Sequence, residues 1–257
     1  MDPLAPYTAV VLAGGKAARL GGQAKPQLLV GGRTMLATVL AAVADAEVRI
    51  VVGPPQPVPP DVVRVRERPP GGGPVAALRA GLAEVPTDVV ALLAGDLPFL
   101  TGALVADLRA RLTGDGEIVV DDGLRDQYLL GVWRTAALRG AVEAIGGPTS
   151  LRRVIAPLTV GRYRPAVVPG TPPPWTDCDT PADLARARAT AAGESGSSTD
   201  SGRRAPAGSR RSWPPLTRRA SSAVSTARPR RDPCPHSNTC PSRHVTHVEL
   251  NMYTWTL

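Results

Sequence analysis

Histidine is missing from most of this chain. The 257 residues include three histidines, and all of them lie after residue 235. A histidine general base is therefore excluded over residues 1–192. Lysine is almost as scarce, because the 30 basic Lys and Arg residues include only two lysines, Lys16 and Lys25. A lysine in a chain so rich in arginine needs a specific explanation, and we expect it to be a phosphate ligand.

Cysteine and long apolar runs are also scarce. The three cysteines, Cys178, Cys234 and Cys240, are too few for a disulfide scaffold and favour a reducing, cytoplasmic compartment. No apolar run approaches the roughly 18 residues that a transmembrane helix needs, so no membrane partner is expected. The N-terminus has no basic segment before its first apolar stretch, so we expect no secretory signal.

Charge divides the chain into two parts. Residues 1–192 carry 20 basic and 18 acidic side chains, whereas residues 193–257 carry 10 arginines and 4 acidic residues. The second part also holds 11 serines and 7 prolines, with almost no apolar periodicity. Such a segment cannot bury enough surface to offset its ordering entropy. We therefore expect one folded domain over 1–192 and a disordered tail over 193–257.

The role of the tail stays open at this point. Arginine-rich stretches such as Arg228-Pro-Arg-Arg231 could attract nucleic acid, but aromatic residues do not alternate with them, so we do not expect that partner. An end of this composition would also result from an altered reading frame in a GC-rich gene. The spacing of its metal-binding residue types does not match an ordinary zinc finger, and incidental clustering is expected. These residues are Cys234, His236, Cys240, His244 and His247.

Apolar strands alternate with amphipathic helices up to residue 192. This alternation predicts an α/β fold, a Rossmann-like, mainly parallel sheet with helices on both faces. Pro74 suits the first turn of one helix, and Thr180 is a plausible N-cap for the last. Ligands of such folds bind beyond the carboxyl ends of the strands. Strands are expected at 7–13, 47–53, 62–66, 88–94, 117–121 and 128–133, and helices at 34–44, 74–84, 101–112 and 181–191.

A glycine-rich loop follows the first expected strand. Gly14 and Gly15 have no Cβ, so their backbone N–H groups can approach phosphate oxygens closely. Arg19 and Lys25 supply positive charge to the same anion. The spacing fits neither the Walker-type loop nor the dinucleotide-binding loop. The loop therefore predicts a phosphate site of another kind.

The pattern Leu-Ala-Gly-Gly-x3-Arg-x-Gly-x3-Lys-Pro, which begins at Leu12, closely resembles the nucleotide-binding loop of nucleotidyltransferases related to molybdenum cofactor guanylyltransferase, the MobA-like NTP transferases. Sugar-phosphate nucleotidyltransferases share the first four residues of this pattern but differ in the rest of the loop. The resemblance covers residues 7–190 and implies a nucleotide-diphospho-sugar transferase-like fold. One position departs from the family, which usually has an acidic residue where Ala24 precedes Lys25.

Two further segments resemble family motifs. Gly73-Pro-Val-Ala76 matches the family's Gly-Pro-Leu-Ala, and Glu67 stands where the family has an acid that contacts the nucleotide. The alternative for this segment is a flexible turn. Asp96-Leu-Pro98 matches the Asp-x-Pro motif that holds Mg²⁺, so the resemblance implies a magnesium ligand at Asp96. A structural alternative, Asp96 as a helix N-cap, is weaker because Thr101 can cap the helix itself.

The late segment Trp175–Leu184 resembles a third motif, with Asp179 in place of the family's Asn. Asp177 and Asp179 lie on the same side of an extended segment and could complete the cation site or contact the acceptor. The alternative is a purely structural helix start. Cys178 points the other way and is expected to be packed.

The resemblance implies an enzyme, a Mg²⁺-dependent nucleotidyltransferase that moves GMP from GTP onto a phosphate-bearing acceptor, molybdopterin, and releases pyrophosphate. Its catalytic residues would be Arg19, Lys25 and Asp96. Gly14 removes a methyl group beside the base, which favours GTP over CTP. The expected nucleotide contacts are Leu12, Ala13, Gly14, Gly15, Arg19, Lys25, Glu67, Gly73 and Asp96.

Two alternatives remain open. The acceptor could be another phosphorylated molecule, served by a CTP-type or sugar-phosphate-type enzyme. The chain could also bind a nucleotide without turnover. From its order along the chain, the Gln127-Tyr128 pair is expected near the acceptor.

Overall fold

The computed structural model describes residues 4–14, 24–147 and 149–196. The expectations for Gly15, Lys16 and Arg19 lie outside the described residues. The same is true of the expectations for the tail beyond residue 196, including its arginine stretches and its cysteines and histidines.

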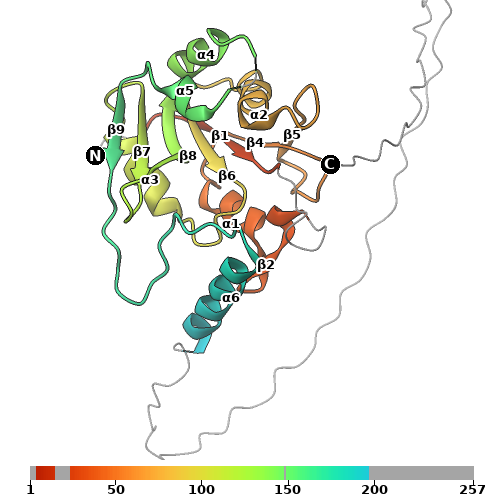
Figure 1. The fold of residues 1–257 in the computed structure, drawn as a ribbon, viewed down its shortest axis with the longest axis vertical. Helices are drawn as coiled ribbons and strands as arrows, with labels where there is room; N and C mark the ends of the chain where they lie inside the picture. The colour runs from red at the N-terminus through yellow and green to blue at the C-terminus, as the bar shows by residue number, and fades with distance from the viewer. Residues whose placement is uncertain (1–3, 15–23, 148, 197–257) are drawn as a thin grey trace, which may run out of the picture. The chain divides into compact units, whose positions relative to one another are not determined.

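A seven-stranded sheet forms the centre of the described chain (Figure 1). Strands β5, β4, β1 and β6 pair with one another in parallel, and β7 pairs in parallel with β9, whereas β8 is antiparallel to both β6 and β7. The expected mainly parallel sheet is confirmed, with β8 as its antiparallel member. In spatial order the strands are β5 (Val63–Val65), β4 (Val48–Val52), β1 (Tyr7–Leu12), β6 (Val89–Ala94), β8 (Asp126–Arg134), β7 (Gly116–Val120) and β9 (Val160–Tyr163).

Helices cover both faces of this sheet, as expected (Figure 1). Helices α1 (Met35–Ala42) and α3 (Gly102–Arg111) pack on one face, and α2 (Gly73–Leu82), α4 (Thr135–Glu143) and α5 (Leu151–Ile155) pack on the other. Central strand β1 sends Val11 into the first core and Val10 into the second, and both side chains are fully buried. A strand buried on both faces reads as a continuous apolar run, which explains the segment Tyr7–Leu12.

The carboxyl ends of four strands lie level at one edge of the sheet. Leu12 is paired with Val52 of β4 and with Ala94 of β6, and Val52 is paired with Val65 of β5. Because β8 runs the other way, with Leu93 opposite Leu130, the start of β8 reaches the same edge. The loops that leave this edge are therefore the ones that can build a ligand site.

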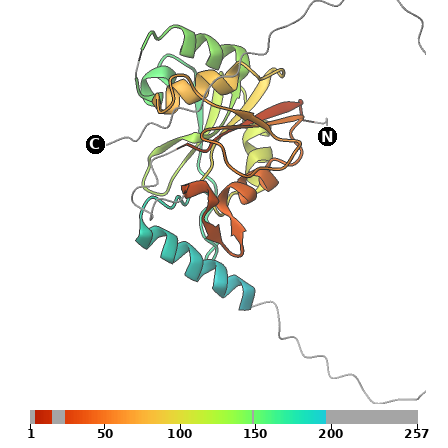
Figure 2. The same cartoon turned by 90° about the vertical axis from the view of Figure 1, so that its right-hand side faces the viewer.

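The last helix lies beside a small hairpin at the end of the domain (Figure 2). Helix α6 (Pro181–Gly196) contacts the hairpin β2 (Leu29–Val30) and β3 (Arg33–Thr34), and it runs five residues beyond the expected end at 191. A separate apolar cluster joins the two. Cys178 is fully buried in that cluster, so the expectation that it is packed is confirmed. The cluster consists of Leu28, Val30, Met35, Cys178, Leu184, Ala187 and Ala191.

Helix α6 begins with a reciprocal cap, which the sequence predicted in part. Thr180 Oγ1 accepts a hydrogen bond from the Asp183 backbone N–H at 3.2 Å, and Asp183 Oδ2 accepts one from the Thr180 backbone N–H at 2.7 Å. This is the geometry of a capping box, with Asp in the place of the usual Glu.

Replacing Thr180 by alanine should lower the free energy of unfolding by about 1 kcal/mol, because the helix loses the side-chain acceptor of its cap. Urea unfolding followed by circular dichroism measures this change. Thr190→Ala is the matched control, since the exposed Thr190 hydroxyl only donates to the Arg186 carbonyl within the helix. Equal stability of the two variants would contradict the role of the cap.

Candidate active site

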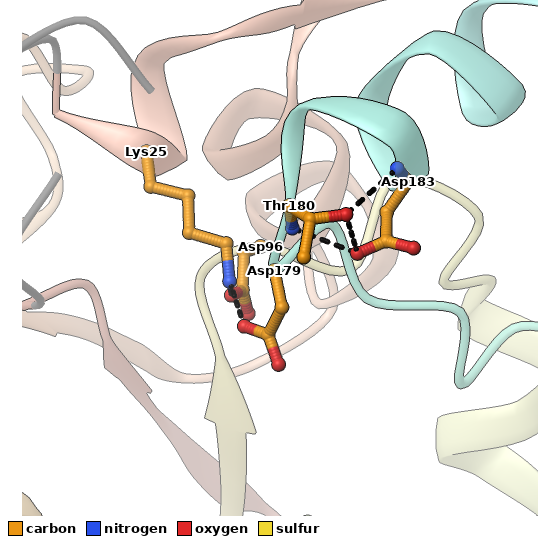
Figure 3. A network of polar contacts seen from close by, with 5 residues as sticks. All are labelled: Lys25, Asp96, Asp179, Thr180 and Asp183. Atoms are coloured by element: carbon orange, nitrogen blue, oxygen red, sulfur yellow. Dashed lines mark hydrogen bonds and ion pairs between the residues drawn. The ribbon is translucent and has the colours of Figure 1, made fainter. Parts of the chain in front are cut away.

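Three charged side chains meet at the carboxyl edge of the sheet (Figure 3). Lys25 Nζ forms ion pairs with Asp96 Oδ2 and, at 2.5 Å, with Asp179 Oδ1. The Lys25 and Asp96 side chains are 16% and 20% exposed, whereas Asp179 is 66% exposed. The sequence singled out all three residues separately, and the structure brings them into contact.

Asp96 is placed by the turn that follows β6. The Gly95 backbone N–H donates to the Leu12 carbonyl at 2.9 Å, and a Cβ at Gly95 would lie only 3.1 Å from Ala13 Cα. Glycine at 95 therefore lets this turn lie against the start of the glycine-rich loop. Thr101 Oγ1 accepts from the Leu104 N–H and caps α3, so Asp96 is not needed as a cap.

Lys25 is placed by a short 3₁₀ helix, η2 (Lys25–Gln27), in which Pro26 is buried. The Gln27 side-chain amide donates to Gln56 Oε1 at 3.0 Å, and the Gln56 amide donates in turn to the Ala13 carbonyl at 3.2 Å. This chain of hydrogen bonds connects the end of the loop to its beginning. Sequence reasoning missed Gln56, because nothing in its spacing distinguishes it from a surface glutamine.

Burial and charge act against each other in this cluster. Burial disfavours the Lys25 ammonium, but the Asp96 and Asp179 carboxylates outweigh it, so the pKa of Lys25 is raised. Burial also raises the pKa of Asp177, and repulsion from Asp179 and Asp96 adds to the effect. Burial raises the pKa of the Cys178 thiol to about 11, which keeps this cysteine protonated and unreactive.

The beginning of the glycine-rich loop is confined by the next strand. The Ala13 N–H donates to the Val52 carbonyl at 2.8 Å, and Gly53 follows directly with a φ of 155°. A Cβ at Gly53 would lie 2.9 Å from the Ala13 carbonyl carbon. At Gly14, by contrast, a Cβ would meet no atom of the described residues nearer than 4.0 Å, so the packing of the described residues does not require glycine there.

Glu67 and Gly73 lie on the β5 side of the same edge. Glu67 is 9% exposed, and its Oε1 accepts a hydrogen bond from the Gly71 N–H at 3.0 Å. Its Oε2 is buried with no hydrogen-bond partner among the described residues. Gly73 is the first residue of α2 and has a φ of 84°, a left-handed conformation that favours glycine. Pro74 stands in the first turn, as expected.

The other half of the edge carries a polar cluster on β7 and β8. Asp121 is almost fully buried and accepts hydrogen bonds from the Arg125 N–H and Nε and from Gln127 Nε2, at 2.8–3.0 Å. Burial opposes the charge of Asp121, but these bonds hold the pKa of its carboxyl below its ordinary value. Gln127 thus lies at this edge with its amide engaged by Asp121, and its expected place near the acceptor stays a prediction.

A second cluster on the same half joins β8 to β9. Arg162 makes a bidentate pair with Asp126, with both N–O distances at 3.0 Å. Tyr128 also donates to Asp126, at 3.2 Å. Sequence reasoning missed Arg162 and Asp126, because they are 36 positions apart and only the pairing of β7 with both β8 and β9 brings them together.

No group of three side chains with metal-binding atoms is arranged to hold an ion in the part of the chain that the structure describes. Asp96, Asp177 and Asp179 do supply hard carboxylate oxygens, the donors that Mg²⁺ prefers. Magnesium in nucleotide enzymes is commonly held by one or two carboxylates together with phosphate oxygens. The donor set therefore fits a cation that the nucleotide helps to bind. Among the described helices, none is long and apolar enough to cross a membrane.

Comparisons with known proteins give a consistent result. The family described as MobA-like NTP transferase domain matches residues 9–164. A molybdenum cofactor guanylyltransferase from Rhodobacter capsulatus is 32% identical over 191 residues, which cover 69% of this chain and 93% of that protein. A probable molybdenum cofactor guanylyltransferase from Mycobacterium tuberculosis (strain H37Rv) is 36% identical over 138 residues, 51% of this chain and 69% of that protein.

A solved structure shows the same fold. Molybdopterin-guanine dinucleotide biosynthesis protein A from Archaeoglobus fulgidus superposes with a TM-score of 0.56 at 18% identity. The match covers 72% of this chain and 99% of that one. The expected nucleotide-diphospho-sugar transferase-like fold is thereby confirmed.

Proposed function

The chain belongs to the MobA-like NTP transferase family and is a nucleotidyltransferase, and from this premise we propose that it transfers GMP from GTP to the phosphate group of molybdopterin, releasing pyrophosphate. The observation that carries the proposal is the contact of Lys25 with Asp96 at the carboxyl edge of the sheet. Lys25 is the cation that we propose to bind the phosphates, and Asp96 is the carboxylate that we propose to bind the metal. The names of the relatives support GTP and molybdopterin, and the few cysteines support a cytoplasmic setting.

The chemistry needs little from the protein beyond placement and charge. The terminal phosphate of the acceptor is already ionised, so it can attack the α-phosphorus without a general base. This agrees with the lack of histidine in residues 1–192. Lys25, with Arg19, would neutralise the charge that develops on the leaving pyrophosphate. The backbone of Leu12, Ala13, Gly14 and Gly15 would lie along the nucleotide.

Asp96 is the residue that we propose to hold Mg²⁺, together with phosphate oxygens of the nucleotide. Asp177 and Asp179 are near enough to influence the electrostatics of that position. When bound, the ion would supply Lewis-acid stabilisation of the transferring phosphoryl group.

Two features support a guanine base. The packing of the described residues does not require glycine at position 14, and close approach of a ligand would explain it. Glu67 offers a buried carboxylate oxygen that lacks a partner among the described residues. The guanine edge presents adjacent N1–H and N2–H₂ donors, which cytosine does not, and such donors suit a carboxylate acceptor.

Replacing Glu67 by glutamine should therefore weaken GTP binding by about tenfold, because a charged acceptor is lost while the shape is kept. Isothermal titration with GTP and with CTP measures the change, and CTP binding should stay as it was. Glu84→Gln, an exposed carboxylate just beyond α2, is the control. An equal loss of affinity for GTP and for CTP would show that Glu67 only stabilises the conformation of its loop.

The function itself is tested by pyrophosphate release. Purified protein with Mg²⁺, GTP and molybdopterin should release pyrophosphate and form a guanylylated product, detected by mass spectrometry. CTP, ATP and UTP serve as competitors, and sugar 1-phosphates as alternative acceptors. A product formed from another nucleotide or another acceptor would reassign the substrates. Tight GTP binding with no product from any acceptor would favour the alternative of a binding protein without turnover.

A further inference from the structure

Lys25 is held by two carboxylates that come from distant parts of the chain. Asp96 belongs to the turn after β6, and Asp179 precedes α6, 154 positions beyond Lys25. We propose that Asp179 is a positioning residue, which keeps the Lys25 ammonium at the carboxyl edge of the sheet by an ion pair that does not depend on Asp96. The inference deepens the proposed function and rests on it for the role of Lys25 at the phosphates.

Asp179 has no other use in the described structure. Its carboxylate makes one polar contact among the residues described, the ion pair with Lys25 Nζ at 2.5 Å (Figure 3). Its side chain is otherwise largely exposed. An exposed carboxylate usually gains little stability from an ion pair. The contact of Asp179 with Lys25 therefore indicates that the segment around Asp179 holds this carboxylate in position.

The backbone on both sides of Asp179 is fixed. On one side Cys178 is fully buried in the cluster between α6 and the hairpin. On the other side Thr180 and Asp183 form the capping box of α6. The carboxylate therefore comes from a segment that is anchored on both sides, by a buried side chain and by a helix cap.

Lys25 depends on partners from elsewhere in the chain, because its own segment provides none. Its neighbours Ala24 and Pro26 carry no charge, and η2 has no acidic residue in its first turn. A lysine has a flexible four-carbon stem, so its ammonium is poorly placed by its backbone alone. If Asp96 turns to a cation, Asp179 becomes the carboxylate that keeps Lys25 in place. The proposal gives Asp179 a role toward the lysine, beside the untested expectation that it binds the metal or contacts the acceptor.

The first test uses the scarcity of lysine. Because Lys16 and Lys25 are the only lysines, acetylation by an N-hydroxysuccinimide ester can be followed at each of them by peptide mass spectrometry. An ammonium held in an ion pair reacts slowly, since the pair must open first. Asp179→Asn should speed the reaction of Lys25 about fivefold and leave Lys16 as an internal reference. This readout needs neither metal nor substrate.

A closely matched control lies at the opposite edge of the sheet. Asp61 pairs with Arg49, and the side chains of that acid and base are 63% and 17% exposed, against 66% and 16% for Asp179 and Lys25. Asp61→Asn should leave the acetylation rates and turnover unchanged. Thermal unfolding of each variant verifies that it is folded.

The second test is a double-mutant cycle on turnover. Asp179→Asn should lower kcat/KM for GTP about fivefold, and Asp179→Glu should restore part of it. In a Lys25→Met background the same Asp179 change should have no further effect. An equal loss in both backgrounds would overturn the proposal, because Asp179 would then act on the metal or the acceptor without Lys25.

The two proposals fail in different ways. Faster acetylation of Lys25 in Asp179→Asn, without any turnover of GTP by the natural chain, would support the positioning role and refute the proposed function. Normal turnover of GTP by the natural chain would support the proposed function. If the acetylation rate of Lys25 were then the same in Asp179→Asn as in the natural chain, the positioning role would be refuted.

Discussion

Replacing Asp96 by asparagine should lower kcat for guanylyl transfer by about 10²–10³-fold, the largest effect we expect from a single residue. Asparagine keeps the size and one acceptor oxygen but removes the negative charge next to Lys25. The site would then lose its attraction for a divalent cation at the point where charge develops. Pyrophosphate release at saturating GTP and Mg²⁺ measures the loss.

Two controls belong to this experiment. Asp107→Asn removes an exposed carboxylate on α3 and should leave turnover unchanged. Circular dichroism shows whether Asp96→Asn still folds, which we expect because Asp179 remains as a partner of Lys25. If kcat stayed within a few-fold of the natural protein, Asp96 could not be the metal-binding carboxylate.

The second large effect is expected at Gly53, which touches no charged group of the site. A Cβ there would lie 2.9 Å from both the carbonyl carbon and the carbonyl oxygen of Ala13. Backbone cannot yield as a side chain can, so Gly53→Ala should push the start of the glycine-rich loop away. We expect a loss of about 1–3 kcal/mol in the free energy of unfolding and of about 10²-fold in kcat/KM.

Gly140→Ala makes the same chemical change where there is room. Gly140 lies on the exposed side of α4, and a Cβ there would meet nothing within 4 Å. Alanine in a helix should stabilise the protein by about 0.5–1 kcal/mol and leave kcat/KM unaltered. Denaturant unfolding and steady-state kinetics on both variants give the comparison. An active Gly53→Ala protein would mean that the loop tolerates displacement.

The sheet was predictable because its strands have strong local patterns. The apolar runs at Tyr7–Leu12 and Val89–Ala94 can be satisfied only by burial on both faces, and Pro74 and Thr180 mark helix starts. The hairpin β2–β3, helices α4 and α5 and strand β9 were not predicted. The hairpin, α5 and β9 are short, so their structure depends on tertiary packing. Helix α4 does carry an apolar face, with Leu138, Ala141 and Val142 at helical spacing, which sequence reasoning missed.

The site was predictable only as separate residues. Motif resemblance drew attention to Lys25, Asp96 and Asp179, and the topology then placed them in contact. Gln56 and Gly53 could not be found this way, because their roles arise from hydrogen bonding and close approach to Ala13 across strands. The roles of Gly15 and Arg19 stay predictions, since both lie outside the described residues.

The position of α6 also has a consequence for biosynthesis. Lys25 leaves the ribosome 154 residues before Asp179, which at ordinary elongation rates is roughly 8–30 s. Until α6 is made, Leu28, Val30 and Met35 lack the partners that bury them. The nascent chain therefore carries an uncovered apolar surface and lacks the Lys25–Asp179 contact until α6 is made. Its early residues cannot act before this helix has docked.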